Sequence, residues 1–206
     1  MFDKNQDVSF RLVTSSGCSR IELASAIISG PEAAGVRACE MRDWLHSFQS
    51  TILIPIELPA ILSAYRFASR NDIQGLIELD QSLGQIAAFA NFHEASRRTG
   101  QKQSKILTGY RATHKIADRF LSAVAKGTTD GCHTTYCGLS IFVKGLDILD
   151  ALERYEKTVL VAFAKILSRR LKDPLEFMLE FNEYIERDVR SARHPCSDLD
   201  VDVTDR

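Results

Sequence analysis

Apolar residues recur along this chain at the three- and four-residue spacing of an α-helix, and no stretch alternates apolar and polar residues as a half-buried strand does. Five prolines are spread over 206 residues, and they lie at plausible helix boundaries. The sequence therefore predicts an all-α fold, a single-domain, bundle-like array of about eight to ten helices. The longest regular segment opens at Asp147 and places one apolar stripe in register, which comprises Ile148, Leu149, Leu152, Tyr155, Val159, Phe163, Ile166 and Leu167.

Capping residues, prolines and glycines place the helix boundaries. Ile52–Ile56 is apolar enough for a strand, but Pro55 removes a ladder donor and Pro59 follows at once, so a buried turn between helices is expected. Gly127–Gly131 is the clearest internal loop. The predicted helical segments are 58–69, a helix from Ile73 capped by Asn71, a long segment 86–107, 113–125, 134–144, the segment that Asp147 opens, and a last helix with Pro174 in its first turn.

Composition divides the chain into three parts. Residues 1–14 are expected to form a partly disordered N-terminal extension, and residues 15–190 are expected to form the all-α domain. Residues 191–206 end in the acidic sequence SDLDVDVTDR. Because this last segment is poor in bulky apolar side chains, a disordered acidic tail is expected.

The overall charge and the cysteines indicate the class of protein. Lys and Arg number 26 and Asp and Glu 27, a formal net charge of -1 that excludes a generally basic nucleic-acid binder but not a local basic patch. Five cysteines without regular spacing indicate a reducing compartment rather than a secreted disulfide scaffold. The strongly apolar stretches are far shorter than the ~20 residues that span a bilayer, and the N-terminus lacks a signal-peptide pattern. A cytoplasmic globular protein is expected.

The most metal-like cluster is Cys132, His133 and Cys137. Two thiolates and an imidazole suit zinc or nickel, but no second half of a four-ligand site occurs elsewhere. Two interpretations stay open: a helical metal-binding enzyme that uses this cluster, or a structural role in which Cys137 packs as a small hydrophobe and His133 caps the helix or hydrogen-bonds locally. The chain has no glycine-rich phosphate loop, serine nucleophile elbow or H-E-x-x-H motif.

Basic residues concentrate between Arg97 and Lys105. Such a stretch can bind phosphate or an acidic partner, although a solvated helix face has the same composition. A second basic pair, Arg169 and Arg170, lies at the end of the longest predicted helix, where cations complement the helix dipole.

As an ordered series of helices and short motifs, residues 15–180 resemble the UreF family of urease accessory proteins. The motifs are Leu-Glu-x-Ala-Val-x-x-Gly, Trp-Leu, an acidic residue before a proline, D-x-x-x-L-x-x-L-D, Glu-x-Arg-x-Ala-Ser-x-x-x-Gly, and a histidine five residues before a glycine that precedes an aromatic-rich helix. They correspond here to Leu23–Gly30, Trp44-Leu45, Glu57–Pro59, Asp72–Asp80, Asn91–Gly100, and His133 with Gly138, Ala151, Leu152 and Tyr155.

Three segments depart from the family pattern. The glycine- and aromatic-rich motif expected at 15–24 is mostly lost, His93 stands where the family has arginine, and 176–181 replace a Gly-Gln…Gly-Gln pattern. Since the resemblance would assign these segments to partner contacts, it implies a divergent member with altered partner choice.

The resemblance implies an all-α homodimer without catalytic activity or a tightly bound cofactor. It implies binding to UreD (also called UreH), to the GTPase UreG and to apo-urease, in a complex that inserts nickel, handles the metal transiently and modulates the GTPase. Neither nucleic acid nor membrane is an implied partner. By position, the candidate partner-binding residues are Arg97, Arg98 and Lys102, followed by Arg169 and Arg170.

Overall fold

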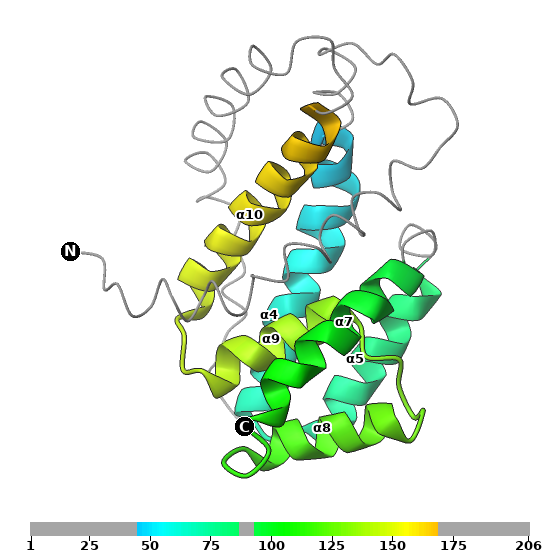
Figure 1. Ribbon diagram of the computed structural model, residues 1–206, viewed down its shortest axis with the longest axis vertical. Coiled ribbons are helices and arrows are strands. Elements are labelled where there is room, and N and C mark those ends of the chain that lie inside the picture. The colour runs from blue at the N-terminus through cyan, green and yellow to red at the C-terminus, as the bar shows by residue number, and fades with distance from the viewer. Residues whose placement is uncertain (1–44, 87–92, 169–206) are drawn as a thin grey trace, which may run out of the picture.

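The computed structural model describes residues 45–86 and 93–168, with side chains described as far as Ala162 (Figure 1). These residues contain no strand, which confirms the all-α prediction for this part of the chain. The predicted parts 1–14 and 191–206 and the helix after Pro174 lie outside it. The elements are η1 (Gln49–Glu57, a π-helix), α4 (Leu58–Ser69), α5 (Ile73–Gln85), α7 (His93–Thr108), α8 (Lys115–Ala125), α9 (His133–Val143) and α10 (Ile148–Ser168).

Helix α9 is the central element of the helical core (Figure 1). Ten of its 11 residues are buried. It packs against α4 and α7, and also contacts α5 and α10. Its buried residues include four polar ones, so the surrounding helices enclose polar as well as apolar side chains: His133, Thr134, Thr135 and Ser140. Its Tyr136 meets Phe120 of α8 edge to face, with ring centroids 5.3 Å apart. The predicted buried helix 134–144 is confirmed, one residue earlier.

Two glycines allow the backbone to approach α9 and its preceding loop closely. At Gly138, a Cβ atom would overlap the carbonyl oxygen of Ile61 and lie 2.7 Å from Cβ of Ala64 on α4. At Gly100 on α7, a Cβ atom would overlap the carbonyl oxygen of Gly131. Because close-packed interiors leave no room for such overlaps, both crossings require glycine.

Residues 45–69 form one continuous helix, so the predicted turn at Ile52–Ile56 was wrong. The helix passes Pro55 through the π-helical segment, in which hydrogen bonds run over five residues, as from the N–H of Leu58 to the carbonyl of Leu53. The wider turn accommodates a residue that has no N–H to donate. Pro59 then lies in the first turn of α4.

By length and composition alone, this helix is long and apolar enough to cross a membrane. This length was not expected from the sequence, because a turn was predicted at Ile52–Ile56. Core helices of globular proteins pass the same test, and α4 packs against α5, α9 and α10. Gln49 and Glu57 are also buried within the helix and hydrogen-bonded to α10. Only 33% of its most apolar window is buried, however, and Ile54 is exposed, so packing within the described part of the chain accounts for part of the apolar composition.

The cap of α5 differs from the prediction by one residue. Asp72, not Asn71, is the N-cap, and its Oδ1 accepts the N–H of Gly75 at 2.9 Å. Asn71 instead adopts a positive φ of 55° in the turn after α4. Asn and Asp both favour N-caps and turns, so the sequence predicted the place of the turn but not which of the two residues caps the helix.

The predicted long helix 86–107 was wrong at its start. Ile86 is extended and ends α5, whereas α7 begins at His93. The start of α10 was predicted correctly, and Oδ1 of Asp147 accepts the N–H of Asp150 at 3.0 Å.

Candidate functional site

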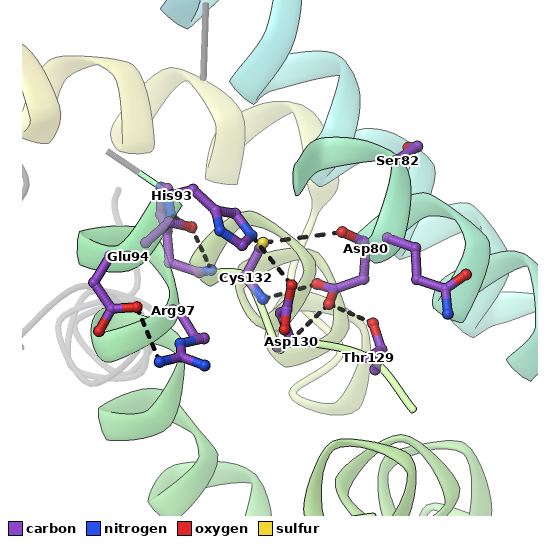
Figure 2. Close-up of polar contacts among 12 residues, drawn as sticks. Asp80, Ser82, His93, Glu94, Arg97, Thr129, Asp130 and Cys132 are labelled. Carbon is purple, nitrogen blue, oxygen red and sulfur yellow. Dashed lines mark hydrogen bonds and ion pairs between the residues drawn. The ribbon is translucent and has the colours of Figure 1, made fainter. Parts of the chain in front are cut away.

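The buried carboxylate of Asp80, on α5, holds the loop that leads into α9 (Figure 2). It accepts hydrogen bonds from Oγ1 of Thr129 at 2.6 Å, from the N–H of Gly131 at 2.7 Å and from the N–H of Cys132 at 2.8 Å. Asp80 thus caps the N-terminus of α9 from another helix, where the helix dipole favours a negative charge. The predicted Gly127–Gly131 loop is confirmed, and Asp80 determines its conformation.

A second buried network joins four helical segments at His133, the first residue of α9. Its Nδ1 lies 2.7 Å from Oγ of Ser96 on α7, and its Nε2 lies 3.0 Å from the hydroxyl of Tyr155 on α10. Tyr155 donates to Oε2 of Glu57, at the end of η1, at 3.0 Å, and Oε1 of Glu57 lies 3.5 Å from Nε2 of His133. All four residues are at most 3% exposed.

These contacts are consistent with one arrangement of hydrogens. Oγ of Ser96 accepts the backbone N–H of His133 at 3.2 Å, so its hydroxyl hydrogen is left to donate to Nδ1. A neutral imidazole then carries its hydrogen on Nε2, facing Tyr155 and Glu57. This tautomer is assigned from the hydrogen-bond network. Both ring nitrogens and both hydroxyl groups then have partners, as a low-dielectric interior requires.

Ser96, His133 and Glu57 are residue types that also form hydrolase triads. Here, however, Ser96 is fully buried, so a substrate carbonyl has no access to its hydroxyl in this conformation. The network therefore positions helices rather than a reacting group. The prediction that His133 hydrogen-bonds locally was wrong, because its partners lie 22 and 37 residues away in the sequence.

Replacing Tyr155 by phenylalanine tests this network. The change keeps the ring but removes the hydroxyl that links His133 to Glu57. We expect the free energy of unfolding to fall by about 1–3 kcal/mol, because a buried carboxylate loses a donor. Urea unfolding followed by circular dichroism measures the change. Tyr110→Phe, at a partly buried tyrosine outside the network, is the control, and equal losses in the two variants would contradict the assigned role.

The three residues of the metal-like cluster lie in different surroundings: Cys132 and His133 belong to separate networks, and Cys137 lies in the core. Burial, and next the carboxylate of Asp80, raises the pKa of the Cys132 thiol well above its usual range. Metal binding requires the thiolate, so this environment opposes it. Cys137 is buried among the core hydrophobic residues, as the structural interpretation predicted. Within 45–86 and 93–168, no group of three His, Cys, Asp or Glu side chains is placed to hold a metal ion.

The basic residues of α7 lie on its outer side. Arg98 and Lys102 are exposed as predicted, whereas Arg97 is half-buried. Figure 2 shows Arg97 directed toward Glu94. Glu94 pairs with both arginines, at 2.9 Å to Nη2 of Arg97 and 3.1 Å to Nε of Arg98. Arg169 and Arg170 lie outside the described residues.

His93 begins α7 at the position where the resemblance expects arginine. Its Nε2 lies 3.3 Å from Oδ2 of Asp130, in the loop that Asp80 holds (Figure 2). The ring also faces α5, since a Cβ atom on Gly84 would lie 3.0 Å from this nitrogen. The substituted residue therefore contacts the protein itself, at the junction of α5, α7 and the loop.

Most residues of the site carry no catalytic or metal-binding sequence signal. Glu57, Asp80, Ser96 and Tyr155 belong to no catalytic or metal motif, and only their places in the family-like motifs singled them out. The structure brings three of them together with His133, and Asp80, from α5, hydrogen-bonds to the loop immediately before that histidine.

Comparison with known proteins identifies one family. The UreF family model matches residues 37–163, which is more than half of the chain and includes the described helices up to most of α10. No curated protein and no solved structure matches the chain significantly.

Proposed function

This chain belongs to the UreF family, whose members act as urease accessory proteins, and from that membership we propose that it is a non-catalytic adaptor in urease maturation. In this proposal it binds UreD (UreH) and the GTPase UreG as a cytoplasmic homodimer, and the complex delivers nickel to apo-urease. The chain itself holds no tightly bound cofactor. The family match over residues 37–163 is the observation that carries the proposal.

The fold suits an adaptor for a physical reason. A protein that holds several partners needs surfaces whose relative positions do not change. The Glu57–Tyr155–His133–Ser96 chain ties η1, α10, α9 and α7 together, and Asp80 ties α5 to the loop before α9. Such fully paired buried networks make a packed interior rigid. The outer faces of these helices are then available as fixed docking surfaces.

Modulation of a GTPase requires tighter binding to one nucleotide state than to another, or donation of a residue to the GTPase site. Arg98 and Lys102 are the exposed candidates on α7. Release of Arg98 from Glu94 costs little, because exposed helix pairs contribute about 0.3–0.5 kcal/mol. The ion pair is thus compatible with a role for Arg98 at a partner surface.

Co-purification tests the proposal. Tagged protein is mixed with separately expressed UreD and UreG, and complexes are analysed by size exclusion with light scattering. We expect a complex with UreD that then recruits UreG. Failure to bind either partner, with the protein helical by circular dichroism, would contradict the adaptor role.

The double change Arg98→Glu/Lys102→Glu tests the α7 surface. We expect UreG recruitment to weaken about tenfold, since two favourable charge interactions become repulsive. The matched control is Arg66→Glu/Arg70→Glu, which reverses two exposed cations at the end of α4. Competition binding with labelled UreG measures the change. Equal weakening by both pairs would show that total charge matters rather than α7.

The alternative of a helical metal-binding enzyme that uses Cys132, His133 and Cys137 predicts stoichiometric metal in the purified protein. The raised pKa of the Cys132 thiol and the engagement of His133 by Ser96 and Tyr155 both oppose such a site. We therefore favour the adaptor.

A further inference from the structure

Charge is unevenly distributed along this nearly neutral chain. Residues 93–130 contain eight Lys or Arg and three Asp or Glu, a formal charge of +5 in a chain whose total is -1. All three acids already have partners: Glu94 pairs with Arg97 and Arg98, Asp118 pairs with Arg111 at 2.6 Å, and Asp130 lies 3.3 Å from Nε2 of His93. The other exposed cations of this region therefore have few acids within it to pair with.

Three of these cations form a stripe along α8, two within the helix and one, Lys126, at its C-cap. Lys115, Arg119 and Lys126 are exposed, and within the described part of the chain they have no ion pair. At 100° per residue, Arg119 and Lys126 lie about 40° and 20° from Lys115, and about 6 Å and 16 Å further along the axis. The buried face of α8 points the opposite way. We call these three residues the α8 cationic stripe.

The same chain carries an acidic segment with a related spacing. Residues 198–205 contain four Asp and no Lys or Arg, and Asp198, Asp200 and Asp202 alternate with apolar residues. In an extended chain, alternate side chains share one face and repeat every ~6.7 Å. This repeat is close to the ~6 Å between the first two cations of the stripe, so an extended segment can place carboxylates along it.

The segment can reach α8 from the described domain. Asp198 follows Ser168, the end of α10, by 30 positions. A chain of that length can span up to about 100 Å, whereas a compact chain of this size has a radius of gyration of about 17 Å. Tethering also gives an intramolecular ligand a high effective concentration, so weak pairs suffice.

We propose that the acidic segment 198–205 docks on the α8 cationic stripe of its own chain. Asp198 and Asp200 pair with Lys115 and Arg119, Asp202 follows in the direction of Lys126, and the docked segment screens the stripe from other anionic macromolecules. Docking is reversible and salt-dependent, because exposed pairs are individually weak. The proposal does not depend on the adaptor function, since neither UreD nor UreG takes part.

Paramagnetic broadening in the full chain tests the proposal. A nitroxide is attached at Cys196, next to the acidic segment, after Cys18 and Cys39 are changed to serine; Cys132 and Cys137 are buried. We expect the label to broaden backbone amide signals of 115–126 at low salt. The broadening should fall about fivefold or more in about 0.5 M NaCl and in the Asp198→Asn/Asp200→Asn/Asp202→Asn variant.

The decisive comparison uses matched charge reversals. Lys115→Glu/Arg119→Glu should abolish the broadening on α8, whereas Arg66→Glu/Arg70→Glu should leave it unchanged. Absence of broadening in the parent chain, or its persistence in Lys115→Glu/Arg119→Glu, would overturn the proposal. Broadening between nitroxide-labelled and separately isotope-labelled molecules would assign the segment to a second copy and would also overturn the intramolecular form.

Discussion

Gly138→Ala is expected to lower the free energy of unfolding by about 3 kcal/mol or more, although alanine favours a helix over glycine by about 1 kcal/mol. The added methyl group would overlap the carbonyl oxygen of Ile61 and lie 2.7 Å from Cβ of Ala64, so α4 and α9 would have to separate. Because α9 is enclosed by other helices, this separation would open gaps on its other sides. Urea unfolding followed by far-ultraviolet circular dichroism measures the loss.

Gly109→Ala is the matched control. Gly109 is exposed after α7, and a Cβ atom there would meet only the carbonyl oxygen of Ile106, at an ordinary 3.6 Å. This change should alter stability by less than about 0.5 kcal/mol. Equal stability of Gly138→Ala and the parent protein would show that the α4–α9 crossing has more room than the structure indicates.

Asp80→Ala is expected to cost about 3–5 kcal/mol of folding free energy. The change removes three short hydrogen bonds and leaves the buried N–H groups of Gly131 and Cys132 without acceptors. Each unsatisfied buried donor costs about 1–3 kcal/mol. The loop before α9 should also loosen, and hydrogen exchange at the amides of Gly131 and Cys132 should accelerate. Urea unfolding measures the stability, and hydrogen exchange locates the change.

Glu78→Ala provides the comparison for Asp80→Ala. It removes the same charge from the same helix, but Glu78 is exposed and its side chain interacts with Gln74 on the surface. We expect a change below about 0.5 kcal/mol. Similar behaviour of the two variants would refute the view that Asp80 holds the loop. Asp80→Asn should be intermediate, since an amide keeps the size but loses one acceptor oxygen.

Helical periodicity was sufficient to predict α4, α8 and α9 to within two residues. It failed at Ile52–Ile56, because Pro55 and Pro59 ordinarily interrupt a helix, and the sequence gives no sign of a shift to π-helical hydrogen bonding. It also failed at Ile86, which was predicted to begin a long helical segment but is extended at the end of α5. Both errors arise because a local pattern reports which residues are apolar, not how the backbone is hydrogen-bonded.

The buried networks could be predicted only in part. The family-like motifs singled out Glu57, Asp80, Ser96, His133 and Tyr155, but the residues lie up to 98 positions apart in the sequence. Nothing in the spacing indicates that they meet, since buried polar pairing depends on how helices pack. Cys132, His133 and Cys137 are the converse case. They are close in the sequence and could be interpreted as one cluster, but in the structure they contact different partners.

The sequence by itself determined the all-α class, most of the helices and the membership of the UreF family, because these depend on periodicity and on motifs read in order. Only the tertiary structure decided what the motif residues do. It placed Asp80 beneath the α9 loop and joined His133 to Ser96 and Tyr155, and it showed that Gly138 lies against the backbone of α4. These roles arise from contacts between distant segments, which exist only once the helices have packed.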